Sequence, residues 1–121
     1  MEKKKIKVGL RYKSKRIFLK VRKCRYLDEA FGLMFRKRES AEALLFDFSG
    51  RKRLAFHSFF VFFPFLAIWL DDKNKIIEIK KIKPFSFNVF SKKPFFKIVE
   101  IPLNKKYSKI IQKLDGRERF K

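Results

Sequence analysis

A nearly continuous apolar run over residues 54–70 constrains this chain more than any other feature. Only His57 and Ser58 interrupt it with polar side chains, and Pro64 stands near its middle. As a helix its 17 residues would reach roughly 25 Å, against a hydrocarbon core of about 30 Å, and a proline inside a helix breaks it. Its content of Phe, Val and Ile favours strands. We therefore predict two buried strands, residues 54–62 and 65–71, with a membrane-inserted segment as the alternative.

The N-terminal stretch has the alternation of a half-buried hairpin. Apolar side chains take every second position, first at Ile6, Val8, Leu10 and Tyr12 and then at Ile17, Leu19 and Val21. A period of two places such residues on one face of a strand. The pattern predicts a hairpin over residues 5–23 that turns near Ser14, buries its apolar face and forms an edge of the fold.

Shorter elements are predicted along the rest of the chain. We expect a brief helix over residues 26–35, a strand over residues 43–48 closed by Ser49 and Gly50, and a turn over residues 71–74. A strand through Ile77, Ile79 and Ile82 should carry a bulge at Lys80 and Lys81. A loop over residues 83–94, a strand over residues 95–101 ended by Pro102, and a helix over residues 104–114 capped by Asn104 complete the chain.

Length and composition indicate one mainly β domain over residues 1–121. The chain is 46% hydrophobic and holds 17 Phe, which is enough apolar material for one core. Its single cysteine, Cys24, cannot form an intrachain disulfide, and its charged N-terminus does not resemble a signal peptide. We therefore expect a cytoplasmic protein and leave its oligomeric state open.

The charge is strongly positive and concentrated at the N-terminus. There are 33 Lys and Arg against 12 Asp and Glu, a net charge of +21, and residues 1–25 alone carry 12 − 1 = +11. Such a balance attracts polyanions, including nucleic acids. The alternative is a proteome-wide bias, because Lys, Phe and Ile are all abundant here and all use AT-rich codons.

The outer face of the predicted hairpin is the strongest candidate for binding. Basic side chains surround one exposed aromatic there, and the candidates are Lys5, Lys7, Arg11, Arg16, Phe18, Lys20 and Arg22. This combination suits the phosphates and unpaired bases of RNA or another polyanion. We predict weak, salt-sensitive binding with little sequence preference. A merely solvated basic face is the alternative.

Catalytic and metal chemistry find little support in the residue types. The only imidazole is His57 and the only thiol is Cys24, and neither stands in a recognisable nucleophile motif. Zinc sites need three or four Cys, His or carboxylate ligands, and Asp71, Asp72 and Asn74 are more typical of a hairpin turn than of a cation site. No Gly-rich phosphate loop is present. We predict no cofactor and no metal, and we favour a non-catalytic protein while leaving an enzyme as the alternative.

Five segments, in order, resemble the family catalogued as domain of unknown function 192. They are residues 32–36 (GLMFR), 43–48 (ALLFDF), 56–64 (FHSFFVFFP), 68–71 (IWLD) and 98–102 (IVEIP), within a resemblance that covers about residues 24–102. The His before an aromatic run ending in Pro resembles archaeal members. The resemblance implies a compact jelly-roll β-sandwich with one or two short helices and an unknown activity. Bacterial members typically carry Trp-Met-Lys-Asn-Thr where this chain has residues 57–61, and Asp where it has Leu66.

Two further site hypotheses follow from these segments. Ligand-binding candidates are Met34, Arg36, His57 and Glu100, and an enzyme would hold a small anionic substrate near the last three. Arg36 could bind a carboxylate or phosphate, or pair internally with Asp47 or Glu100. The surplus Phe over residues 59–65 could instead form a contact with a protein or a membrane.

Overall fold

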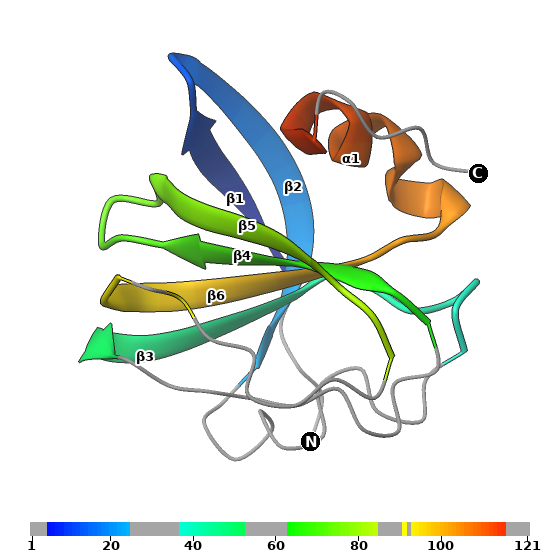
Figure 1. The fold of residues 1–121 in the computed structure, drawn as a ribbon, viewed down its shortest axis with the longest axis horizontal. Coiled ribbons are helices and arrows are strands. Elements are labelled where there is room, and N and C mark those ends of the chain that lie inside the picture. Colours follow the sequence, from blue (N-terminus) through cyan, green and yellow to red (C-terminus); the bar gives the residue numbers. More distant parts are fainter. Residues whose placement is uncertain (1–4, 25–36, 53–62, 85–90, 92, 116–121) are drawn as a thin grey trace.

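The fold is a six-stranded mixed sheet with one short helix after it. The structure is a computed structural model that describes residues 5–24, 37–52, 63–84, 91 and 93–115 (Figure 1). Its strands are β1 (Lys5–Tyr12), β2 (Lys15–Cys24), β3 (Leu44–Lys52), β4 (Phe65–Leu70), β5 (Ile76–Ile82) and β6 (Phe95–Pro102). A 3-10 turn, η2 (Lys105–Tyr107), leads into α1 (Ser108–Asp115).

The sheet curls into a half-barrel. Its strand order is β1-β2-β3-β6-β4-β5, with β2 and β3 parallel and the other neighbours antiparallel. The two edge strands approach each other at one point, where Arg11 and Lys75 form an isolated bridge and the Arg11 N–H donates to the Asn74 carbonyl oxygen at 2.9 Å. The curl gives the sheet a concave face, which α1 covers (Figure 1).

The concave face holds the larger core. Inward residues of β1, β2, β3, β4 and β6 meet Tyr107, Ile111 and Leu114 from η2 and α1 in one buried cluster, and the partly buried Ile76 and Ile79 of β5 pack against it. Those three side chains are 8%, 1% and 2% exposed, and burying each contributes roughly 2 kcal/mol. The helical spacing predicted for this segment is therefore confirmed, and it exists because one side of the helix packs on the sheet.

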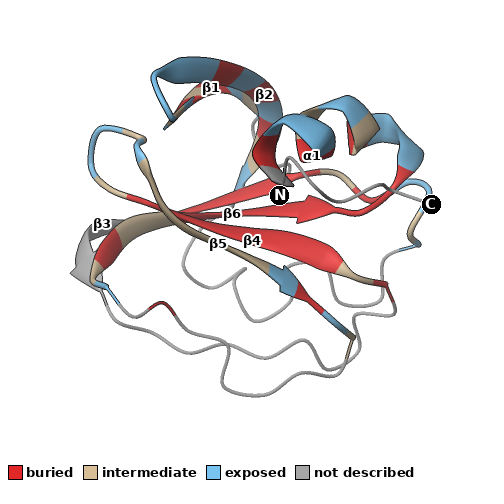
Figure 2. Ribbon diagram, turned by 45° about the horizontal axis from the view of Figure 1, so that its top comes forward, coloured by how far each residue is buried: buried red, intermediate tan, exposed pale blue. Residues whose placement is uncertain are grey.

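The central strands are buried on their other face as well. A second cluster includes Phe46, Phe63, Phe65, Trp69 and Phe95, and the Trp69 and Phe95 rings meet edge to face with centroids 6.5 Å apart. Every residue of β4 is buried, as Figure 2 shows by its uniform colour. A strand buried on both faces needs no polar positions, which explains the uninterrupted apolar sequence there.

The predicted hairpin is confirmed in detail. β1 pairs with β2 in a two-residue turn register that sets Tyr12 against Lys15, with Lys13 and Ser14 between them. Val8, Leu10, Ile17, Leu19 and Val21 are buried, whereas Phe18 is exposed. The strands predicted at residues 65–71 and 95–101 are also confirmed, as β4 and β6.

Two details of the strands differ from the prediction. β3 continues past Gly50 to Lys52, with an irregular register between Asp47 and Lys52. The bulge in β5 does not lie at Lys80 and Lys81, which pair regularly with β4. It lies at Ile77, because consecutive β4 residues pair with Glu78 and Ile76 and skip it. Ile77 and Ile79 consequently pack against different clusters.

The jelly-roll sandwich is not shown by the strands that the structure describes, which form one sheet. The helix predicted over residues 26–35 and the strand predicted over residues 54–62 lie outside the described residues, as does much of the loop over residues 83–94. Within the described residues, the second part of the apolar run is a strand, and no helix is long and apolar enough to span a membrane.

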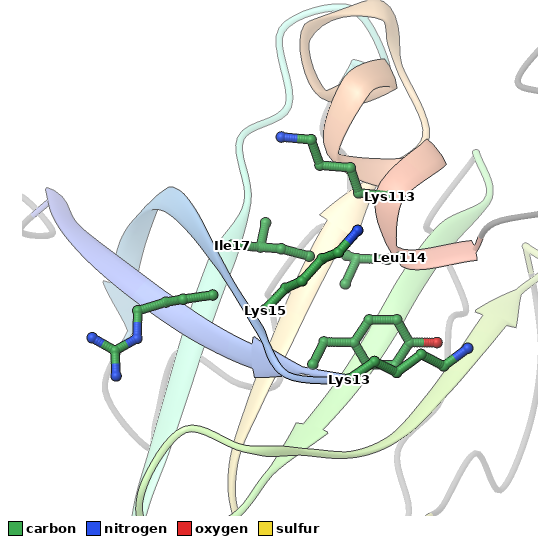
Figure 3. A pocket seen from close by; sticks show the side chains of 7 residues that line it. Lys13, Lys15, Ile17, Lys113 and Leu114 are labelled. Atoms are coloured by element: carbon green, nitrogen blue, oxygen red, sulfur yellow. The ribbon is translucent and has the colours of Figure 1, made fainter.

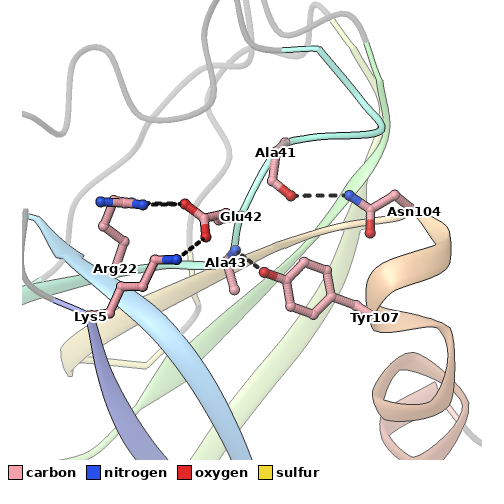
Figure 4. A network of polar contacts seen from close by, with 7 residues as sticks. All are labelled: Lys5, Arg22, Ala41, Glu42, Ala43, Asn104 and Tyr107. Atoms are coloured by element: carbon pink, nitrogen blue, oxygen red, sulfur yellow. Dashed lines mark hydrogen bonds and ion pairs between the residues drawn. The ribbon is translucent and has the colours of Figure 1, made fainter.

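A polar network ties residues 37–43 to the start of the C-terminal helix (Figure 4). The Asn104 amide does not cap the helix as predicted. Its Nδ2 donates instead to the carbonyl oxygens of Arg38 and Ala41, at 2.7 and 3.1 Å. The Ala43 N–H donates to the Tyr107 hydroxyl at 2.8 Å, and burial raises the pKa of this phenol above its ordinary value. These contacts hold the segment that leads into β3, next to the hairpin, against the start of the C-terminal helix.

Candidate polyanion interface

The hairpin places like charges directly opposite each other on its outer face. Lys7 pairs with Lys20 across the strands, and Arg11 pairs with Arg16. Lys7, Arg16, Lys20 and Arg11 are all exposed, and within the described part of the chain none of these four forms an ion pair with an acid. Like charges facing each other cost a few tenths to about 1 kcal/mol per pair. This face therefore carries positive charge that the described structure leaves unneutralised.

Phe18 lies between the two like-charged pairs. Its partner across the strands is Gly9, and 55% of its surface is exposed. A Cβ at Gly9 would come within 3.2 Å of Phe18 Cε1 and 3.1 Å of Arg16 Cδ, so both side chains lie close over the β1 backbone. Lys7 Nζ lies 5.3 Å from the centre of the Phe18 ring. The absence of a side chain at Gly9 thus lets an aromatic ring and the methylene carbons of Arg16 lie across β1.

The first pair of the hairpin differs because one acid bridges its two cations. Lys5 lies opposite Arg22, and Glu42 bonds to both (Figure 4). Lys5 Nζ is 2.8 Å from Glu42 Oε2, and Arg22 Nε donates to Glu42 Oε1 at 3.0 Å. The hydrogen bonds from Lys5 and then Arg22 lower the pKa of Glu42 to about 2. Lys5 and Arg22 are therefore committed to an internal contact, unlike the other predicted candidates.

Sequence reasoning missed two contributors to this face. Glu42 is 20 residues from Arg22 along the chain, and no local pattern indicates that contact. Gly9 interrupts the alternation of charged residues on β1, and the only signal of its role is its position between Lys7 and Arg11.

A family comparison decides the identity of the domain. The model of DUF192, described as "Uncharacterized ACR", matches residues 12–111. The chain belongs to the DUF192 family. The resemblance stated from sequence is confirmed, and the match extends beyond the expected residues 24–102 on both sides. β1 lies almost wholly before this match, whereas β2 lies within it, so the match does not account for the β1 half of the outer face of the hairpin.

Two solved structures share the fold of this DUF192 domain. A protein of Sinorhizobium meliloti 1021, named a "putative transcription regulator", aligns with a TM-score of 0.74 at 20% identity and covers 84% of this chain and 83% of its own. A protein of unknown function from Novosphingobium aromaticivorans DSM 12444 aligns with a TM-score of 0.71 at 18% identity and covers 94% and 80%. At these identities the likeness concerns the fold alone. No curated protein matches the DUF192 chain in sequence.

The other candidate site of the DUF192 domain is described only at one residue. Met34, Arg36 and His57 lie outside the described residues, and the side chain of Cys24 is not described either. Glu100 is buried at 9% exposure on β6, opposite Leu44 and Ala67. Both neighbours belong to the second, Phe-rich cluster, so Glu100 faces that side of the sheet.

The acidic turn between β4 and β5 has a structural role in the DUF192 domain. Asp71 Oδ1 accepts the N–H groups of Lys73 and Lys75 at 2.8 and 2.9 Å. Asn74 adopts a φ of 65°, and its Oδ1 accepts from Lys97 Nζ at 2.8 Å. Among the described residues, no group of three His, Cys, Asp or Glu side chains lies close enough to hold a metal ion.

Proposed function

We propose that this DUF192 protein is a non-catalytic binding module for single-stranded RNA, held on the outer face of the β1–β2 hairpin. One observation carries the proposal. Two like-charged pairs flank the exposed ring of Phe18, and within the described residues neither pair meets an acid. An anionic strand laid along the hairpin would lower the repulsion within both pairs.

The aromatic ring favours a single strand over a duplex. An unpaired base can stack on an exposed aromatic, and such stacking contributes roughly 1–3 kcal/mol per base. A duplex keeps its bases inside and offers only phosphates. Because phosphate contacts carry no base information and every base has a stacking face, the proposed binding has little sequence preference.

The geometry sets the scale of the salt dependence. The open part of the face presents four cations, Lys7, Arg11, Arg16 and Lys20. Four phosphate contacts with a single strand give a slope of about −2.8 in log K against log salt. The affinity should then fall roughly 50-fold between 50 and 200 mM salt. Binding by one or two stray lysines would give a much flatter dependence.

The decisive experiment measures fluorescence anisotropy of a labelled, unstructured RNA against two charge-matched variants. Lys7→Ser with Lys20→Ser removes two charges from the hairpin face, whereas Lys105→Ser with Lys109→Ser removes two exposed charges from the helical end. We expect the first variant to lose about tenfold or more in affinity at 100 mM salt and the second to change less than about twofold. Equal losses, or no binding at 50 mM salt, would reject the hairpin as a site.

The other readings of the sequence have less to stand on. An enzyme that uses His57 and Arg36 depends on residues outside the described part of the chain. A contact through the surplus Phe loses two of its members, because Phe63 and Phe65 are buried at 2% and 1% exposure. Neither reading is supported by an observation comparable to the charged hairpin.

A further inference from the structure

A cavity lies between the turn of the hairpin and the last turn of α1. Its volume is about 380 Å³, which falls within the range of sites for small molecules. Figure 3 shows Lys13 and Lys15 of the turn region on one side and Lys113 and Leu114 of α1 on the other. Segments about 100 residues apart in sequence therefore form one concave surface, which no local sequence pattern indicates.

Cations dominate the rim of this cavity, and among the described residues no acid lines it. Its charged residues are Lys13, Lys15, Arg16 and Lys113. In the described part of the chain, none of the four has an ion pair. A helix C-terminus favours one nearby cation, which accounts for Lys113. It does not account for three more from the hairpin.

The apolar part of the lining has a different character. Tyr12, Ile17 and Leu114 complete the cavity. Ile17 and Leu114 belong to the main core cluster, and Tyr12 packs against it. The cavity thus joins a strongly positive rim to an apolar wall, as sites for molecules with an anionic head and an apolar body do.

The backbone of the turn supplies an independent observation. Lys13 and Ser14 have φ values of 47° and 67°. Two-residue hairpin turns of this kind prefer Asn followed by Gly, because side chains with a Cβ are strained in the left-handed region. A lysine stands here at a strained position and lines the cavity. Residues held in such conformations are enriched at ligand sites.

We propose that this cavity binds a small organic phosphate monoester. A monoester carries nearly two negative charges and three acceptor oxygens at neutral pH, which matches a rim of several cations better than a single carboxylate does. Its phosphate lies among Lys13, Lys15 and Lys113, and its organic part lies against Tyr12, Ile17 and Leu114. The cavity shares Arg16 with the proposed RNA face, but the residues proposed to hold the phosphate, Lys13, Lys15 and Lys113, do not belong to that face.

The test is an NMR titration of the full chain with 1-naphthyl phosphate, with inorganic phosphate and 1-naphthol as separate arms. We expect saturable shifts of the backbone amides of residues 12–17 and 113–114. Lys113→Ser should weaken binding about fivefold, as for the loss of one exposed charge contact. Lys20→Ser, on the hairpin face, should leave it unchanged within about twofold.

Two variants of the turn separate the effect of ligand contact from the effect of backbone strain. Lys13→Asn should raise the melting temperature and weaken 1-naphthyl phosphate binding, whereas Ser14→Gly should raise the melting temperature and leave binding intact. The proposal is overturned by an absence of saturable shifts up to about 5 mM, or by equal effects of Lys113→Ser and Lys20→Ser. Inorganic phosphate binding as tightly as the monoester would refute a role for the apolar wall, and equal binding of 1-naphthol would refute the phosphate site.

Discussion

The two ends of the β1–β2 hairpin carry the same kind of residue and use it differently. At one end, Lys5 and Arg22 lie across from each other and share the carboxylate of Glu42. Farther along, Lys7 lies across from Lys20 and Arg11 from Arg16, and in the described structure no carboxylate joins them. One acid from another segment thus bridges two cations that would otherwise repel each other, and forms ion pairs within the protein. The comparison teaches that basic composition alone does not identify a binding face; the placement of the acids does.

Removing Phe18, the aromatic between the two like-charged pairs, should have the largest effect on RNA binding. Phe18→Ala is expected to weaken RNA binding by roughly 1–3 kcal/mol, because it deletes the stacking surface. Stability should change little, since the side chain is 55% exposed. Anisotropy titrations and urea unfolding measure the two quantities. Phe18→Trp is the control and should retain binding; an Ala variant that binds RNA like the parent would remove the stacking role.

Placing an acid in one of the two like-charged pairs should have the next largest effect on RNA binding. Lys7→Glu places a carboxylate opposite Lys20 and so replaces a like-charged cross-strand pair with a pair of opposite charge. Stability should rise by a few tenths to about 1 kcal/mol, as for other cross-strand pairs of opposite charge. RNA affinity should fall about tenfold, because one attraction becomes a repulsion. The free energy of unfolding should therefore rise while the RNA affinity measured by anisotropy falls. A variant that is both less stable and equally good at binding would contradict the comparison.

Removing the Glu42 carboxylate should lower the free energy of unfolding by about 1 kcal/mol. Glu42 is partly exposed, so the benefit is well below what its full pKa shift would imply. Because its pKa falls from 4.5 to about 2 on folding, the benefit is complete above about pH 4.5 and is lost as the pH drops toward 2.

The measurement compares urea unfolding of the parent and Glu42→Gln at pH 7 and at about pH 2.5. The difference between the two proteins should shrink at the lower pH, while the other carboxylates titrate in both and cancel. Glu42→Gln should also bind RNA slightly more tightly at pH 7, since Lys5 and Arg22 gain freedom to meet phosphates. A pH-independent difference in stability would show that the ion pairs contribute nothing.

The hairpin could be predicted from sequence because one of its faces is buried and the other is not. Apolar and polar residues alternate along β1 and β2, so the sequence shows which face of the strand each residue occupies. The two-residue turn follows from that register. β4 could be predicted for the opposite reason, since burial on both faces leaves an apolar run too short for a membrane helix.

The features that escaped prediction depend on partners distant in sequence. The bulge in β5 lies where β4 skips Ile77, so its position is set by the neighbouring strand and not by the pattern of β5 itself. Asn104 serves residues 38 and 41 instead of its own helix. Glu42 meets Lys5 and Arg22 only because the parallel pairing of β2 with β3 brings the segments together. The curl of the sheet into one half-barrel is equally a sum of such distant pairings.

The smallest expected effect concerns Gly9, which lies opposite Phe18 between the two like-charged pairs. An alanine in a strand normally gains roughly 0.5–1 kcal/mol over glycine. Here its Cβ would lie 3.1 Å from Arg16 Cδ and 3.2 Å from Phe18 Cε1, so both side chains must shift by a few tenths of an ångström. The gain and the crowding should nearly cancel, leaving Gly9→Ala within about 0.5 kcal/mol of the parent in urea unfolding. The displaced ring should nevertheless reduce RNA affinity about threefold in anisotropy titrations. A loss of stability above 1 kcal/mol would mean that the Phe18 ring and the Arg16 methylene carbons are held rigidly. An unchanged affinity would mean that the closeness of Phe18 to the β1 backbone does not matter for binding.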